Sequence, residues 1–236
     1  MAPSHCLGGI MIRYIFLALF LIAAPVAEAK QRKVIEELPA DIVDNNYVAA
    51  VTVTIADSAR EKFDKIEEKA LAKRAEEGLP PYDPANPPAV QPAADTYDTL
   101  PFSAMLPLVM RDVTREWGLD ESKGKAVDLK ITIETIRTAN AAVAMLIGSA
   151  DELAGLIDVV DPATGANIGS FYVHVINTHS GWGGMLIRGG GIRERLAEEF
   201  ALESARLLTG STKKDWKKRL KEKQKAQKAS NVASTD

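Results

Sequence analysis

The sequence predicts an α+β fold: a mainly antiparallel sheet of about four strands with helices packed on one face, plus a proline-rich connector and a basic C-terminal tail. Two observations carry this prediction. Apolar and polar residues alternate over 127–134 and 168–176, as they do in half-buried strands. Apolar residues then recur every three or four positions over 192–208, which is typical of a helix that docks on a sheet.

A hairpin is expected to join the strands 153–160 and 168–176. Asp161, Pro162 and Gly165 lie between them, and these residue types favour a tight turn because they supply a side-chain acceptor, a fixed φ and a positive φ. The strand alternation of 127–134 slips at Thr135, which indicates a bulge or the end of that strand.

Earlier in the chain, the same patterns predict a strand over 47–55 and helices over 58–78 and 102–117. Ser58 and Glu61 have the spacing of a capping box, and Pro107 must lie near the first turn of its helix or kink it. Residues 139–150 are apolar without a clear period, so a buried helical turn, a strand and a loop all stay open.

The N-terminus has the three regions of a secretory signal peptide: Arg13, the uncharged run 15–24 and the small-residue site 27–29. We expect cleavage after Ala29 and a periplasmic location. The only cysteine, Cys6, precedes the run, so the mature chain is not expected to be a lipoprotein. The predicted organisation is a signal peptide at 1–29, a lead-in at 30–45, one domain at 46–210 and a tail at 211–236.

Charge and proline content describe the remaining segments. The net charge of −3 is too mild to indicate a nucleic-acid partner. Residues 79–101, inside the domain, hold seven of the twelve prolines and are predicted to form an extended connector. Residues 213–228 carry nine Lys or Arg and two acidic residues. The tail is interpreted either as a solvated helix or as a peripheral contact with an anionic membrane or envelope surface, with Trp216 as its anchor.

Catalytic, cofactor and metal sites are not expected. His174 and His179 are the histidines that remain after processing; they lack the spacing of a zinc motif and have no acidic ligand cluster beside them. The glycine run 181–191 lacks the lysine and hydroxyl of a phosphate-binding P-loop.

That run still suggests a binding surface. Backbone N–H groups at the start of a helix, together with nearby guanidinium groups, suit a phosphate or sulfate. Large apolar side chains inside a glycine-rich loop suit a partner or a membrane. The candidate contact residues are therefore Arg188, Arg193, Arg195, Trp182 and Leu186.

Several short motifs occur in a recognisable order: Asn140-Ala141-Ala142, Leu146-Ile147-Gly148, the turn 161–165, the glycine run and the helix with Phe200. With them the chain resembles an uncharacterised group of bacterial secreted proteins and lipoproteins known only as a domain of unknown function. These in turn are similar to the small α/β domains of envelope lipoproteins, such as the N-terminal part of the curli-secretion lipoprotein. The resemblance covers 46–210 and implies a fold and a compartment, without catalytic residues.

The resulting hypothesis is a non-enzymatic periplasmic accessory protein that acts by binding or assembly with an envelope protein or an anionic envelope component. The alternative is a binding protein for an anionic small molecule, lipid or glycan, which would use the glycine run and its arginines. A hydrolase is the third hypothesis, and no residue constellation favours it.

Overall fold

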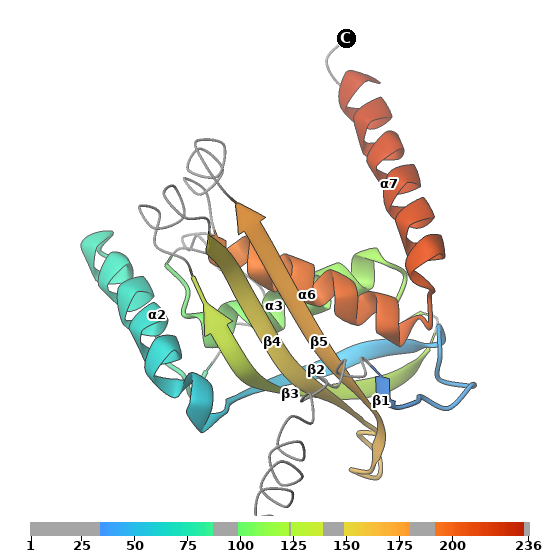
Figure 1. Cartoon of the computed structure of the whole chain (residues 1–236), viewed down its shortest axis with the longest axis horizontal. Coiled ribbons are helices and arrows are strands. Elements are labelled where there is room, and N and C mark those ends of the chain that lie inside the picture. Colours follow the sequence, from blue (N-terminus) through green and yellow to red (C-terminus); the bar gives the residue numbers. More distant parts are fainter. Residues whose placement is uncertain (1–33, 87–98, 123, 139–148, 180–191, 234–236) are drawn as a thin grey trace, which may run out of the picture. The chain divides into compact units, whose positions relative to one another are not determined.

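The helices and strands of the computed structural model are labelled in Figure 1. It describes residues 34–86, 99–122, 124–138, 149–179 and 192–233, which fall in one compact unit. In chain order its elements are β1 (Val34–Glu36), β2 (Asn46–Ile55), α2 (Asp57–Glu76), α3 (Phe102–Glu116), β3 (Lys125–Arg137), β4 (Ser149–Val160), β5 (Asn167–His179), α6 (Ile192–Leu208) and α7 (Lys213–Ala233).

The strands form one sheet in the order β1-β5-β4-β3-β2. Three neighbouring pairs are antiparallel, and β2 runs parallel to β3. The α+β class is therefore confirmed, and the expectation of a mainly antiparallel sheet of about four strands is slightly off: the sheet has five strands, and one of its pairs is parallel. The chain crosses from β2 to β3 through α2 and α3, and such a crossover makes the two strands parallel. The fifth strand, β1, lies in the segment that was expected to be a lead-in.

The predicted hairpin is confirmed, with β4 and β5 paired over their full length. The Asp161 carboxylate accepts hydrogen bonds from the Ala163 N–H at 2.8 Å and the Thr164 hydroxyl at 3.0 Å, and these donors lower the pKa of Asp161. Gly165 has a φ of 72°, which a residue without a Cβ adopts at no steric cost. Its N–H closes the turn on the Asp161 carbonyl at 2.8 Å.

The predicted slip in β3 is a bulge between Ile133 and Thr135. Gly155 of β4 lies opposite Ile133, and a Cβ on it would come within 2.5 Å of the Thr132 carbonyl oxygen. A glycine is therefore required where the bulged strand approaches its neighbour.

One face of the sheet is buried beneath two helices. Val127, Leu129, Ile131 and Ile133 of β3 are at most 1% exposed, and Phe200 of α6 is fully buried. Helices α3 and α6 lie side by side across this face (Figure 1), where α3 contacts β2 and α6 contacts β4 and β5. The opposite face carries polar residues such as Thr52 and Lys130, as the alternation predicts.

Helix α2 packs beside this layer. Its Phe63 ring meets Phe102 of α3 edge-on, with the ring centroids 6.2 Å apart. The Glu67 carboxylate accepts the Ser103 N–H at 2.8 Å and so caps the start of α3, while burial raises the pKa of Glu67. The predicted capping box is wrong: α2 begins at Asp57, and the Ser58 hydroxyl donates to the Glu134 carbonyl at 3.1 Å.

Residues just after β1 also belong to the packed structure. Leu38 and Ile42 are buried in the core at 9% and 7% exposure. The buried Asn46 amide donates to the Ile42 carbonyl at 2.9 Å and to the Leu208 carbonyl at 3.3 Å. This amide joins the start of β2 to the end of α6, which is the region from which α7 departs.

Several predicted features lie outside the described residues: the leader, most of the connector 79–101, residues 139–148 and the glycine run 181–191. In the ranges that are described, no helix has the length and the apolar content that a membrane span requires.

The burial pattern predicts the cost of a charge on each face. We expect Val173→Asp to lower the free energy of unfolding by roughly 3 kcal/mol or more, because Val173 is fully buried and the new carboxylate would have no partner. Thr132 lies on the opposite face, so Thr132→Asp is expected to lower the free energy of unfolding far less. Denaturant unfolding of both variants measures the difference, and equal losses would contradict the assignment of faces.

Candidate functional site

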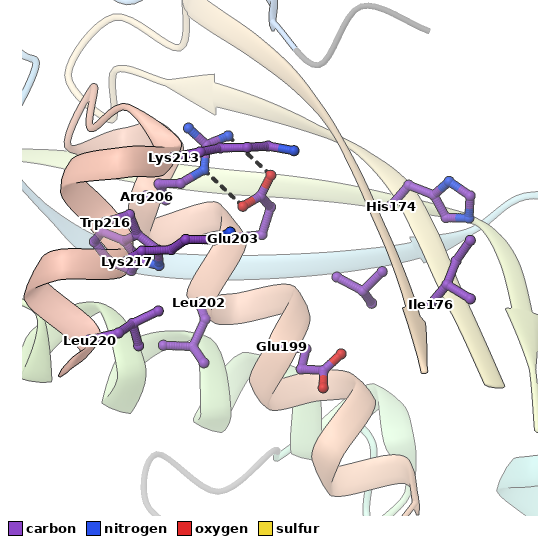
Figure 2. A pocket seen from close by; sticks show the side chains of 11 residues that line it. His174, Ile176, Glu199, Leu202, Glu203, Arg206, Lys213, Trp216, Lys217 and Leu220 are labelled. Carbon is purple, nitrogen blue, oxygen red and sulfur yellow. Dashed lines mark hydrogen bonds and ion pairs between the residues drawn. The ribbon is translucent and has the colours of Figure 1, made fainter. Parts of the chain in front are cut away.

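A groove of about 370 Å³ lies between β5, α6 and α7. Figure 2 shows its walls: Leu202, Glu203 and Arg206 on α6 and Trp216, Lys217 and Leu220 on α7, with His174 and Ile176 across the opening on β5. The complete lining is His174, Val175, Ile176, Glu199, Leu202, Glu203, Arg206, Lys213, Trp216, Lys217 and Leu220.

The connection between α6 and α7 sets the direction of α7, which forms one wall of the groove. Gly210 has a φ of 62°, and the Ser211 N–H returns to the Arg206 carbonyl at 3.1 Å, as in a glycine-terminated helix end. Thr212 then caps α7, because its hydroxyl accepts the Asp215 N–H at 3.2 Å. These bonds fix the point at which the chain turns from one helix into the next.

Arg206 lines the groove near the end of α6, and hydrogen bonds hold its side chain in place. Its guanidinium donates to both carboxylate oxygens of Glu203, at 2.8 and 3.0 Å, and to the Ser211 carbonyl at 2.8 Å. Arg206 is only 8% exposed, so this ion pair is held in a partly desolvated place where two-point geometry is worth more than on the open surface. The pair orients the Arg206 guanidinium, and its hydrogen bond to the Ser211 carbonyl ties α6 to the connection that leads to α7.

A small aromatic cluster holds α7 against the domain. Trp216 is 5% exposed, and its ring centroid lies 4.3 Å from that of Trp117, at the end of α3. The Arg219 guanidinium lies 5.8 and 5.5 Å from the two ring centroids and donates to the Trp117 carbonyl at 3.4 Å. Trp216, considered above as an interfacial anchor, is thus a structural side chain of this cluster.

The floor of the groove is apolar. Leu202 and Leu220 pack beside Trp216, and Val175 and Ile176 complete the lining from β5. Ile176 is 51% exposed, a high value for a branched apolar side chain next to an already formed hydrophobic surface.

Strand β5 borders the groove with an open edge. Its outer neighbour, β1, pairs only with Phe171 and Ser170. Along Val173–His179, no strand of the described chain pairs with this side of β5, which leaves roughly 20 Å of strand edge. Backbone N–H and C=O groups on such an edge are a template for another strand.

The charged residues at the rim differ in their partners. Lys213 and Lys217 make no hydrogen bond or ion pair with the described residues, whereas Glu203 is paired with Arg206. Across the opening, the His174 ring and the Arg137 guanidinium both contact the Glu152 carboxylate, at 2.8 and 3.0 Å. The eleven lining residues include no Ser, Thr or Cys, and no metal-binding group of His, Cys, Asp or Glu occurs in the described ranges.

Of the predicted contact residues, Arg193 and Arg195 are described, and neither lines this groove. Trp182, Leu186 and Arg188 lie outside the described residues. Arg193 and Arg195 are on the first turn of α6, at the end opposite Arg206, and a separation of two residues points them to different sides of the helix. The Arg193 guanidinium donates to the Leu100 carbonyl at 3.4 Å.

Arg193 does line a second cavity, of about 330 Å³, together with Lys69 and Lys73 of α2. Ile66, Ala70, Thr138 and Ile192 complete its lining. Three cations therefore face one partly apolar hollow, although Lys73 also lies 3.9 Å from Glu77. The sequence indicated Arg193 but not the two lysines, because only the packing of α2 against this region brings them together.

Comparison with known proteins gives partial likenesses. No protein-family model and no curated protein matches the chain. Among solved structures it is similar to the PelC dodecamer from Paraburkholderia phytofirmans, with 12% identity, 75% of this chain and 95% of that chain covered and a TM-score of 0.36. It is also similar to lipoprotein GNA1162 from Neisseria meningitidis, with 16% identity, coverages of 61% and 93% and a TM-score of 0.23. Likenesses of this degree reach no further than a partial similarity of fold.

The aromatic cluster predicts how α7 contributes to stability. Trp216→Ala should lower the free energy of unfolding by roughly 3 kcal/mol, because it empties the space against Trp117 and Ala205. The matched control is Lys214→Ala, an exposed position on the same turn, which should change it by less than about 0.5 kcal/mol. Urea unfolding followed by circular dichroism measures both, and an unchanged stability in the Trp216 variant would show that the cluster does not hold α7.

Proposed function

We propose that this chain is an exported, non-enzymatic accessory protein of the bacterial cell envelope that works by binding an extended segment of another protein in the groove between β5, α6 and α7. The observation that carries the proposal is the open edge of β5 beside an apolar groove. Each of the two features supplies one half of what a strand-adding partner requires.

The edge supplies backbone hydrogen bonds. A segment that added to β5 alongside Val173–His179 would lie about 4.8 Å from it and would pair with groups that β1 leaves uncovered. Main-chain pairing of this kind gives affinity with little dependence on the partner's sequence.

The groove supplies selectivity. Side chains of an added strand alternate between its two faces, so every second one would point toward the helix layer. There it would meet Leu202 and Leu220, with Lys213 and Lys217 at the rim to attract a carboxylate. The groove is therefore suited to a segment with alternating apolar side chains and at least one acidic residue.

The N-terminal leader and the resemblance of 46–210 to secreted proteins and lipoproteins of bacteria support the proposed compartment. Binding through a strand edge needs no covalent link between the chain and its partner.

The test is site-specific photocrosslinking in intact cells. A photoreactive residue at Ile176 or at Leu220 should give a discrete crosslinked product, since both positions line the groove. Mass spectrometry of that product identifies the partner and the segment in contact.

The control position is Leu71 of α2, an apolar residue that is 42% exposed, compared with 51% for Ile176. It is matched in chemistry and exposure but lies away from the groove. A product of equal yield at Leu71, or no product at either groove position, would contradict the proposal.

The second candidate function is binding of an anionic small molecule, lipid or glycan, and the cavity with Lys69, Lys73 and Arg193 favours it. A phosphate in this cavity would be close to three cations while its organic part contacted Ile66 and Ile192.

Calorimetric titration with glycerol phosphate tests this second candidate. Binding should be weakened about tenfold by Lys69→Ala, because one charge-assisted contact is lost. Lys62→Ala, an exposed lysine of the same helix that does not line the cavity, should leave it unchanged. Absence of binding to the unaltered protein, or equal weakening by both variants, would exclude this cavity as an anion site.

A further inference from the structure

The side of α7 that faces away from the groove carries a row of lysines. Lys214, Lys218, Lys221 and Lys225 are all exposed and are spaced by four, three and four residues. At 100° per residue they fall within an arc of about 60°, opposite the side that holds Trp216, and extend over about 16 Å of helix. We call these four residues the lysine stripe.

Nothing in the described chain occupies this stripe. Lys218 lies 4.0 Å from Glu222 of its own helix, and the other three make no ion pair or hydrogen bond with described residues. Beyond Leu220 the exposed Lys221, Glu222 and Lys225 give α7 no apolar contact with the domain. Trp216 and Leu220 hold the first turns of α7, and a polar helical segment beyond them would gain stability from an external surface.

The same chain carries a surface of opposite charge. Asp112 and Glu116 of α3 and Glu194 and Glu198 of α6 surround a groove of about 380 Å³ whose floor is Val109 and Val113. No Lys, Arg or His is among its lining residues; Arg115 lies 3.9 Å from Asp112, and Glu116 and Glu194 also interact with other residues of the chain. We call this the acidic groove.

The spacings of the two surfaces correspond. On each helix of the acidic groove the two carboxylates are four residues apart, which places them about 6 Å from each other. Two pairs of lysines in the stripe, Lys214 with Lys218 and Lys221 with Lys225, have the same separation. A helix laid along the groove could therefore bring successive lysines to successive carboxylates.

We infer that the lysine stripe of one copy of this chain binds the acidic groove of a second copy. Within one copy this contact does not form, because α7 leaves the C-terminal end of α6 (Figure 1) with Trp216 packed on Trp117, and the stripe lies on the side of α7 opposite Trp216. The two surfaces differ, so the contact is head-to-tail and each copy offers both halves of it.

The inferred self-association does not use the groove between β5, α6 and α7. The stripe lies on the side of α7 opposite Trp216, and the acidic groove shares no lining residue with the groove beside β5. A chain can therefore assemble with itself while its strand edge stays accessible.

The experiment measures the mass of the chain from Lys30 onward by sedimentation at low and at moderate salt. The unaltered protein should form complexes larger than the monomer at low salt and should dissociate as salt rises, because exposed charge pairs are screened. The triple variant Lys214→Glu, Lys218→Glu, Lys221→Glu should stay monomeric, and so should the triple variant Asp112→Lys, Glu116→Lys, Glu198→Lys.

Mixing the two triple variants gives the decisive result. Each altered surface then meets its new complement, so the equimolar mixture should assemble although neither variant does so alone. A third variant, Lys62→Glu, Lys65→Glu, Lys69→Glu, makes the same charge change on exposed lysines of α2 and should assemble like the unaltered protein. Circular dichroism of each variant checks that it is folded.

Three outcomes would overturn the inference. The first is that the unaltered protein stays monomeric at low salt. The second is that the mixture of folded variants fails to assemble. The third is that the α2 variant loses assembly as fully as the α7 variant. Binding of the monomer to vesicles rich in phosphatidylglycerol, lost in the α7 variant, would assign the stripe to a membrane instead.

Discussion

Burial of the apolar face of β3 is the constraint on which the rest of this structure depends. Val127, Leu129, Ile131 and Ile133 lie between two neighbouring strands and beneath the helix layer, and none is more than 1% exposed. Burying such a run requires a cover that reaches across the sheet: α2 contacts β3 itself, α3 contacts β2, and α6 contacts β4 and β5. The position of α6 is therefore determined by the core, and the position of its last turn follows.

The last turn of α6 in turn determines where the candidate site forms. Gly210 ends the helix, Arg206 holds the connection through Glu203 and Ser211, and Trp216 fixes the next helix to Trp117. An apolar groove results because α7 leaves the domain beside β5 without covering its edge. Most folded proteins protect a long strand edge, and an edge that the described residues leave unpaired next to an apolar surface is the reason for proposing a strand-adding partner.

The charges of this chain are unevenly distributed, both along the sequence and over the surface of the fold. The basic residues of 213–228 are concentrated on one helix while the whole chain has a net charge of −3, so the remainder is acidic. The fold gathers four of those acids around Val109 and Val113 and presents four lysines on the outer side of α7. Complementary surfaces on one chain favour association with copies of itself, provided that the two cannot meet within a single copy.

The sequence by itself determined the elements with a strong period: β3, the β4–β5 hairpin with its Asp161 turn, and the apolar stripe of α6. These follow from alternation, turn chemistry and helical spacing, all of which are local. It did not determine the parallel β2–β3 pair or the strand β1, because strand partners are chosen by contacts between residues far apart in the chain. The sequence did not predict the groove for the same reason. In the sequence, Ile176 is one position of an alternating strand, and Leu220 is an isolated apolar residue in a basic tail. Only the tertiary structure, through the buried contact of Trp117 with Trp216, brings them to one surface.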